Sequence, residues 1–233
     1  MSTTAALAGS TGLVGSHILS QLLAHPSISS LHAYTRRKLP NATASTKLNP
    51  LSSTDTSTWA SLFPTSPAPK IFLSALGTTR GQAGSVEAQR KVDLDLNYAL
   101  ATAAKAAGVE TYVLISSMGS NSASRMPYAQ MKGELEDKVK ALKFKNTVIL
   151  RPGVIVGSRE DSRPAEAALR HLAWGLRKVA GGALVDFWAQ DAEVIARAAV
   201  EAGLAASEGK GKGDKDGVWL LMQKDVVEWG KQK

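Results

Sequence analysis

AALAGSTGLVGSHILSQLL, residues 5–23, carries three closely spaced glycines, Gly9, Gly12 and Gly15. The residues before them, 5–8, are apolar and predict a short buried strand, and the apolar residues after them recur at helical spacing as far as His25. Glycine loses more conformational entropy on folding than any other residue, so three glycines at a strand-to-helix junction need a geometric reason. A turn that binds phosphate groups would supply one.

The rest of the chain repeats this alternation of strand and helix. Apolar and β-branched runs predict strands at 30–35, near Leu48, and at 70–77, 111–117, 146–151 and 217–222. Helical periodicity predicts helices at 92–108, 128–142, around 164–179 and 190–206, with a helical last turn. The Pro/Ser/Thr-rich passage from Leu39 to Pro69 is expected to be mostly irregular. Strands alternating with helices pair in parallel through right-handed crossovers, so we expect an α/β fold, a doubly wound Rossmann sheet with helices on both faces.

Size and composition limit the class of protein. With 233 residues and 44% apolar content, the chain is expected to form a single domain over residues 1–233. It has no cysteine, which excludes disulfides, thiolate metal ligands and cysteine nucleophiles. The four histidines show no metal-ligand spacing, so no metal site is expected. No apolar stretch approaches the roughly 20 residues that span a bilayer, and a soluble chain is expected.

The formal net charge of +8 would attract nucleic acid, anionic lipid or an acidic small ligand alike. Several of the positive charges lie in GKGKGDKDG, residues 209–217, a glycine-rich run typical of a solvated loop. No aromatic residue interleaves these charges to stack on bases. The sequence therefore predicts no nucleic-acid partner.

The glycine pattern predicts a dinucleotide site. Gly9 would permit the tight turn, Gly12 would let the backbone approach a pyrophosphate, and Gly15 would allow the helix to pack closely on the strand. The helix beginning near Leu13 would present unpaired N–H groups and the positive end of its dipole to the phosphates. No Gly-Lys-Ser/Thr follows, which excludes a Walker loop. The alternative is that the glycines serve only the turn and its packing.

Two arginines follow the second predicted strand. Where a carboxylate would accept the ribose hydroxyls of NAD, the chain carries Arg36 and Arg37. Guanidinium groups bind a 2′-phosphate through charge-assisted hydrogen bonds, and a carboxylate there would repel it. The pair therefore favours NADP(H), with two solvated surface arginines as the alternative.

A serine pair and a Tyr-x-x-x-Lys sequence predict proton chemistry. The strand at 111–117 ends in Ser116 and Ser117, and Tyr128 and Lys132 follow one helical turn apart on a shared face. An ammonium within reach lowers the pKa of a phenol from about 10, so Tyr128 would protonate the oxygen formed when hydride reaches a carbonyl carbon. Ser117 would orient that carbonyl.

Two further patterns are given no catalytic role. Tyr34 and Lys38 share the Tyr-x-x-x-Lys spacing, but no serine strand precedes them. Charged residues of both signs also follow Tyr128 on its predicted helix. They are interpreted as a solvated face and are Glu134, Glu136, Asp137, Lys138 and Lys140.

Five strings spread over nearly the whole chain resemble the atypical short-chain dehydrogenase/reductases. They are GSTGLVG, ALGTTRGQAG, ISSMGS, YAQMKGELE and LRPGVIVGSREDSRP. Within that superfamily the chain is most similar to the fungal mitochondrial outer-membrane Fmp-type proteins and the animal Tat-interactive oxidoreductase, through LGTTRG and SREDSRP.

The resemblance implies roles for particular residues. Ser117, Tyr128 and Lys132 would be the catalytic set, with Ser116 as the alternative to Ser117. The implied cofactor-binding residues are Gly9, Ser10, Thr11, Gly12, Leu13, Val14, Gly15, Arg36, Arg37, Leu76, Gly77, Lys132, Pro152 and Gly153. The chain departs from the pattern at Asp93, where extended members often have asparagine, and in a serine-to-tyrosine gap that is a residue or two shorter.

Residues and resemblance together favour an NADPH-dependent reductase that acts on a small-molecule carbonyl or alcohol. The alternative is an NADP(H)-binding regulatory or scaffold protein with little or no turnover. Residues 154–190, with Trp174 and Trp188, would cover the substrate side, since ligands bind outside the carboxyl ends of the strands.

The expected location also follows from the resemblance. It implies peripheral residence on the cytosolic face of the mitochondrial outer membrane, and the positive charge would favour contact with anionic lipid. Without that resemblance the cytoplasm is expected.

Overall fold

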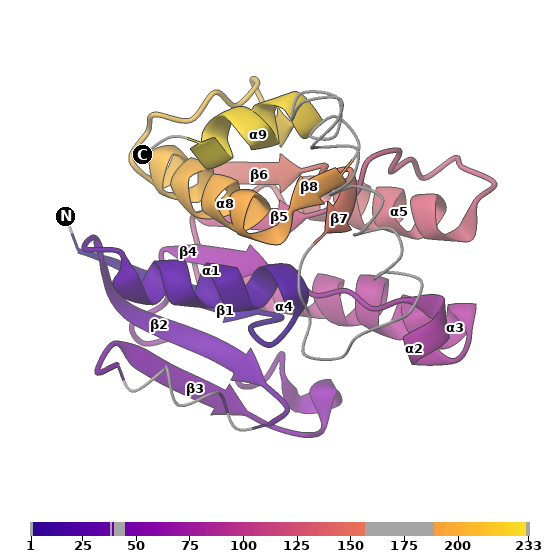
Figure 1. Ribbon diagram of the computed structural model, residues 1–233. Coiled ribbons are helices and arrows are strands. Elements are labelled where there is room, and N and C mark those ends of the chain that lie inside the picture. The colour runs from indigo at the N-terminus through magenta and orange to yellow at the C-terminus, as the bar shows by residue number, and fades with distance from the viewer. Residues whose placement is uncertain (1, 38, 40–44, 157–188, 232–233) are drawn as a thin grey trace.

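The computed structural model describes residues 2–37, 39, 45–156 and 189–231. Its main feature is a sheet of seven parallel strands in the order β3-β2-β1-β4-β5-β6-β9 (Figure 1). These strands are β1 (Thr3–Ala8), β2 (Ile28–Thr35), β3 (Leu48–Ser52), β4 (Ile71–Ser74), β5 (Thr111–Ile115), β6 (Asn146–Leu150) and β9 (Val218–Leu221). The predicted doubly wound parallel sheet is confirmed.

Helices cover both faces of this sheet (Figure 1). One face carries α1 (Leu13–Ala24), α8 (Ala192–Ser207) and α9 (Gln223–Lys231), and the other carries α4 (Asn97–Ala106) and α5 (Pro127–Ala141). A separate pair of parallel strands, β7 (Val154–Val156) and β8 (Ala189–Asp191), was not expected from the sequence. The predicted helix around 164–179 lies outside the described residues.

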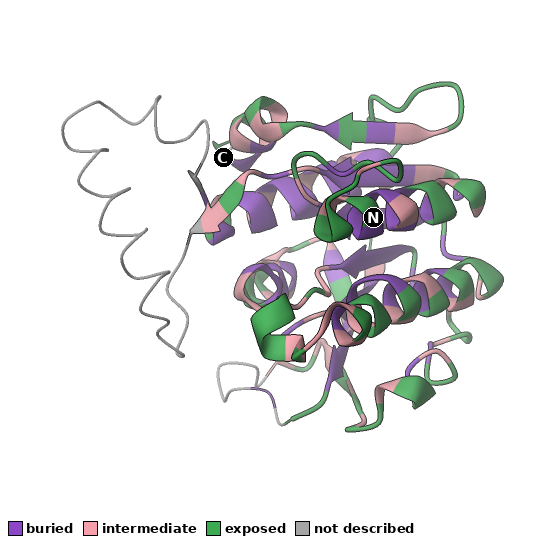
Figure 2. Cartoon of the chain, turned by 90° about the vertical axis from the view of Figure 1, so that its right-hand side faces the viewer, coloured by how far each residue is buried: buried purple, intermediate pink, exposed green. Residues whose placement is uncertain are grey.

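The core has two parts, one on each face of the sheet. Along β1, Ala5 and Leu7 belong to the part beneath α1 and α8, and Ala6 and Ala8 to the part beneath α4 and α5. A parallel strand buried on both faces reads as one continuous apolar run, which is why residues 5–8 are recognisable in the sequence. Figure 2 shows the buried residues gathered in the strands and on the helix sides that face them.

Aromatic side chains fill much of the core beneath α4 and α5. Tyr34 stacks on Trp59 with ring centroids 5.2 Å apart, and Phe72 meets Tyr112 edge to face at 5.4 Å. Aromatic pairs with such geometry add about 0.5–1.5 kcal/mol beyond the area that they bury. Tyr34 is therefore a core residue, in agreement with giving the Tyr34–Lys38 spacing no catalytic role.

The predicted start of the helix at 92–108 is wrong, because helical structure begins earlier. α2 (Arg80–Ala83) and α3 (Val86–Arg90) precede a wider π-helical segment, η3 (Lys91–Leu96), which continues into α4. The Ser85 hydroxyl caps α3 by accepting the N–H of Ala88 at 3.0 Å. Within the widened turn, the Asn97 side-chain amide donates to the carbonyl oxygens of Val92 and Asp93 at 3.1 and 3.2 Å.

Two strands that lead toward the predicted site are shorter than expected. β4 ends at Ser74 rather than near Gly77, and β5 ends at Ile115 rather than at Ser117. The residues that follow leave the sheet at its carboxyl edge. They are the residues to which the sequence assigns cofactor and substrate contacts.

Candidate active site

The topological switch point of the sheet lies at the carboxyl ends of β1 and β4. The chain proceeds from β1 to β2 and β3 on one side and then returns to β4 on the other, so β1 and β4 mark the topological switch point. In open α/β sheets, ligands bind outside the strand ends at such a point. A Cβ built on Gly9 would lie 2.6 Å from the backbone carbon and oxygen of Ala75, so the two strand ends touch here.

The glycine turn after β1 is too tight for other residues. Gly9 has φ +86°, a left-handed conformation that L side chains rarely adopt, and its carbonyl accepts the N–H of Gly12 at 2.9 Å. A Cβ on Gly15 would lie 1.9 Å from the Gly9 oxygen, and one on Gly12 would lie 3.2 Å from it. A side chain at Gly15 would therefore displace the turn.

The amino end of α1 is suited to an anion. Its N-cap is Gly12, which supplies no side-chain hydrogen bond, and its first turn contains no acidic residue. The Gly12 N–H is already bonded to the Gly9 carbonyl, but the N–H groups of the first turn that follows have no partner within the helix, and the helix dipole adds positive potential. The glycine turn and this helix end therefore fit the pyrophosphate of a dinucleotide.

Side chains of the glycine turn also connect it to β2. The Ser10 hydroxyl is buried and donates to the Tyr34 carbonyl at 2.7 Å, whereas Thr11 is exposed. Leu13 and Val14 open α1, and Val14 packs in the core. Ser10 thus contributes to the shape of the turn.

The arginine pair lies where β2 leaves the sheet. The Arg37 N–H donates to Thr35 Oγ1 at 3.2 Å, and the Thr35 hydroxyl donates back to the Arg37 carbonyl, which fixes the backbone of this turn. Both Arg36 and Arg37 are exposed. Within the described part of the chain no carboxylate pairs with either guanidinium.

Lys132 lies against the end of β5. Its side chain is only 3% exposed, and Nζ donates to the Ile115 carbonyl at 3.2 Å, directly before the serine pair. Tyr128, on the first turn of α5, is 43% exposed. The Asn121 N–H donates to the Ala129 carbonyl at 3.0 Å and holds the loop after the serines against that turn. The structure therefore gathers the serine loop, Tyr128 and Lys132 at one edge of the sheet.

The two serines differ in their contacts. Ser116 is buried, and its hydroxyl donates to Glu136 Oε1 at 2.5 Å. Ser117 is half-buried, and its hydroxyl makes a long contact of 3.4 Å to the Met118 carbonyl. Ser117 is thus the more available donor.

A buried carboxylate lies within electrostatic reach of the lysine. Asp93, on η3, is 1% exposed and accepts the Thr78 N–H at 2.8 Å. Burial raises the pKa of Asp93, while the positive charge of Lys132 and the Thr78 hydrogen bond act in the opposite direction. Its position beside Lys132 was not predicted from the sequence, which showed only a departure from the family pattern.

Gly133 allows the serine loop to lie on α5. A Cβ on Gly133 would come within 2.1 Å of the Ser122 nitrogen and 2.2 Å of the Asn121 carbonyl carbon. A glycine inside a helical pattern costs about 1 kcal/mol relative to alanine, so it can indicate a position where another backbone packs closely. The glycine directly after Lys132 is thus the one sequence feature that could have indicated this contact.

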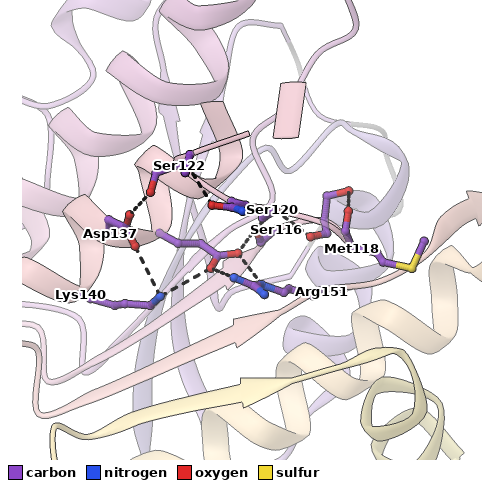
Figure 3. A network of polar contacts seen from close by, with 11 residues as sticks. Ser116, Met118, Ser120, Ser122, Asp137, Lys140 and Arg151 are labelled. Atoms are coloured by element: carbon purple, nitrogen blue, oxygen red, sulfur yellow. Dashed lines mark hydrogen bonds and ion pairs between the residues drawn. The ribbon is translucent and has the colours of Figure 1, made fainter. Parts of the chain in front are cut away.

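The interpretation of residues 134–140 as a solvated face is wrong for Glu136. This side chain is 1% exposed, and Arg151 Nη2 pairs with its Oε2 at 2.6 Å (Figure 3). The neighbouring Asp137 is 59% exposed, as expected. Leu135 and Val139 are buried on either side of Glu136 in the sequence, so the helix turns this position toward the sheet.

The remaining predicted cofactor residues follow β4 and β6. Leu76 is half-buried and Gly77 is exposed after β4. Pro152 is buried and accepts the Met118 N–H at 2.8 Å, and the Gly153 N–H donates to Gln190 Oε1 at 3.1 Å. Of the predicted cover at 154–190, the stretch 157–188, with Trp174 and Trp188, lies outside the described residues.

Two other kinds of feature are absent from the described residues. No group of three or more His, Asp or Glu side chains there could hold a metal ion. No helix among them is long and apolar enough to cross a bilayer.

Sequence comparison with known proteins identifies the family. A family model described as HIM1 matches residues 43–176. The protein fmp52-1, mitochondrial, of Aspergillus terreus is 51% identical over 230 residues, covering 97% of this chain and 98% of the relative.

Comparison with solved structures gives the fold. The Bordetella bronchiseptica enzyme WbmH, in complex with NAD⁺, is similar with a TM-score of 0.65 and 15% identity, over 100% of this chain and 93% of that one. A short-chain dehydrogenase/reductase superfamily protein from Agrobacterium tumefaciens, with bound NAD, is similar with a TM-score of 0.62 and 16% identity, over 85% of this chain and 73% of that one. At this identity the similarity establishes a Rossmann-like fold.

Proposed function

This chain belongs to the family of the Fmp52 mitochondrial proteins, and we propose that it is an NADPH-dependent oxidoreductase that reduces a carbonyl compound. The observation that carries the proposal is the placement of Lys132, a buried cation at the end of β5, on the same helix and face as Tyr128. Burying a charge is costly unless it is paired, and Asp93 and the Ile115 carbonyl compensate this one. A buried charge beside an exposed phenol at the carboxyl edge of a parallel sheet is where catalytic groups of such folds are expected.

The cofactor would lie across the carboxyl edge of the sheet. The glycine turn and the amino end of α1 would hold its pyrophosphate, and Arg36 with Arg37 would hold a 2′-phosphate. Leu76 and Gly77 would border the adenosine, and Pro152 and Gly153 the nicotinamide. NADPH, when bound, supplies the hydride.

The residues of the chain would bind and protonate the substrate. Ser117 would donate a hydrogen bond to the carbonyl oxygen, and the Tyr128 hydroxyl would donate the proton that this oxygen needs once the carbon is reduced. Lys132 would stabilise the phenolate that remains through its positive charge. Ser116 is the weaker candidate for Ser117's role, because its hydroxyl already donates to Glu136.

Replacing both arginines should change the cofactor preference. In Arg36→Ala/Arg37→Ala, we expect the Kd of NADPH to rise about tenfold to a hundredfold. A hydrogen bond to a charged group contributes about 1.5–3 kcal/mol, and because both arginines are exposed we expect the pair together to contribute about as much as one such bond. NADH lacks the 2′-phosphate that the arginines would bind, so its Kd should change less than about threefold. Titration of each nicotinamide, followed by its bound fluorescence, measures both constants.

A matched control separates this effect from net charge. Lys212→Ala/Lys215→Ala removes the same charge from the exposed loop at 209–217, and both affinities should stay near those of the unmodified chain. Equal affinity for NADPH and NADH in the unmodified chain would contradict the proposed cofactor preference.

The location is a separate proposal. The relatives are named mitochondrial, and we place this chain on the cytosolic face of the outer membrane as a peripheral protein, with its charge of +8 attracted to anionic lipid. We expect co-sedimentation with vesicles that contain phosphatidylserine and its loss as salt is raised, because salt screens surface charges. Equal binding to neutral vesicles would contradict an electrostatic attachment.

A further inference from the structure

Glu136 holds a buried carboxylate at the meeting point of three elements. Its Oε1 accepts the Ser116 hydroxyl at 2.5 Å and Arg151 Nε at 2.9 Å, and its Oε2 accepts Arg151 Nη2 at 2.6 Å (Figure 3). Lys140 Nζ lies 3.7 Å from Oε2. The carboxylate thus joins α5 to the ends of β5 and β6.

The contacts of Ser116 extend to the backbone of Ser117. The hydroxyls of Ser116 and Ser120 are 3.0 Å apart, and the Ser120 hydroxyl donates to the Ser117 carbonyl at 2.6 Å. Both Ser116 and Ser120 are buried. Each hydroxyl has one proton, so with Ser116 donating to Glu136 and Ser120 donating to Ser117, the two hydroxyls only contact each other. Glu136 therefore fixes Ser116, the residue directly before the one proposed to orient the substrate, and Ser120 holds the carbonyl of that residue from the other side.

The position of Glu136 on α5 relates it to the other proposed catalytic residues. It follows Lys132 by one helical turn and Tyr128 by two, so all three lie on neighbouring parts of one helix face. A carboxylate fixed at both oxygens allows the helix little rotation or sliding against the serine turn. Through Arg151 the same group is fixed to the strand end that continues into Pro152 and Gly153.

We propose that Glu136 is a positioning residue that sets the turn at 116–120, and with it Ser117, relative to Tyr128 and Lys132. The positioning itself is argued from the hydrogen bonds alone. Its consequence for catalysis rests on the proposed function. A buried ion pair adds little net stability compared with apolar packing. A role in positioning the turn therefore explains the Glu136–Arg151 ion pair better than a contribution to stability does.

The first test measures the turn directly, by hydrogen exchange of the amides of Ser116, Met118 and Ser120 in the full chain. These N–H groups donate to the carbonyls of Leu150, Pro152 and Ser117 at 2.8, 2.8 and 3.2 Å. In Glu136→Gln, which keeps the shape but turns a donor toward Arg151, we expect their exchange to accelerate at least about tenfold while amides of β1 are unchanged.

The second test measures turnover, with 9,10-phenanthrenequinone as the carbonyl probe. In Glu136→Gln we expect kcat per folded molecule to fall at least about tenfold, with KM and the Kd of NADPH changed less than about threefold. A purely structural role would lower the melting temperature without this split between kcat and KM.

Glu136→Gln leaves the Arg151 charge without its carboxylate partner, so two further variants serve as controls. Ser120→Ala removes only the hydroxyl that bonds Ser117 and leaves the Glu136–Arg151 pair intact, and we expect faster exchange and lower kcat in the same direction. Asp137→Asn makes the same charge change at the exposed neighbouring position, and we expect exchange at 116–120 and kcat near those of the unmodified chain.

The outcomes separate this proposal from the proposed function. Unchanged exchange in both Glu136→Gln and Ser120→Ala would overturn the positioning role whatever the activity. Accelerated exchange with unchanged kcat would overturn its catalytic consequence. If the unmodified chain binds NADPH but reduces no probe, the proposed reduction fails, and the exchange result alone decides whether Glu136 sets the turn.

Discussion

In Tyr128→Phe, we expect kcat for a carbonyl probe to fall at least about a hundredfold, because a positioned proton donor contributes about 10²–10⁴-fold to such a reaction. The Kd of NADPH should change less than about threefold, since the ring is retained and only the hydroxyl is lost. Tyr128 is 43% exposed, so the fold should tolerate the change. Steady-state turnover and nicotinamide fluorescence measure the two effects.

Tyr98→Phe is the matched control for this prediction. Tyr98 lies on α4 with Lys138 Nζ 4.8 Å from its ring centroid, so the substitution removes a phenol hydroxyl away from the serine turn. Turnover should stay near that of the unmodified chain. If Tyr128→Phe retains full turnover as well, Tyr128 is not the proton donor. If the unmodified chain binds NADPH but shows no turnover, an NADP(H)-binding regulatory role becomes the better account.

In Gly15→Ala, we expect the Kd of NADPH to rise at least about a hundredfold. The new methyl group would lie 1.9 Å from the Gly9 oxygen, a separation that real Cβ atoms essentially never show, so the turn must move. Overpacking of this kind costs about 1–3 kcal/mol or more, and here the group displaced is the backbone proposed to hold the phosphates. Thermal unfolding should show the cost in stability.

Gly81→Ala is the control for Gly15→Ala. Gly81 lies in α2, and a Cβ there meets nothing within 4 Å. Alanine favours a helix over glycine by about 0.5–1 kcal/mol, so this variant should be at least as stable as the unmodified chain and bind NADPH normally. Normal NADPH binding by Gly15→Ala would show that the phosphates bind elsewhere.

Patterns local in the sequence predicted most of the described fold. The strand at 5–8, the glycine turn and the helix after it are recognisable because a parallel strand is apolar on both faces and a helix repeats with its own period. The start of the helix near Val86 was missed because it depends on the cap at Ser85 and on a π-helical segment that the Asn97 side chain stabilises. Such contacts leave no periodic pattern in the sequence.

The candidate site was predicted less completely than the fold. Tyr128, Lys132 and the serine pair were identified by their spacing and their place after a strand. Glu136 was misassigned because a charged residue among other charged residues predicts a solvated face. Its partner Arg151 follows the next strand, β6, and only the folding of α5 onto the sheet brings the two side chains together. The position of Asp93 beside Lys132 likewise depends on how two helices meet.

The central claim is that the glycine turn holds a dinucleotide pyrophosphate and so directs the nicotinamide toward Tyr128. The crystal structure of the chain with NADPH tests it most directly. We expect the pyrophosphate at the amino end of α1 beside Gly9 and Gly12, the 2′-phosphate at the arginine pair, and the nicotinamide on the side of Tyr128. If the protein's own side chains still cover the carboxyl ends of β1 and β4 at saturating NADPH, the claim is contradicted.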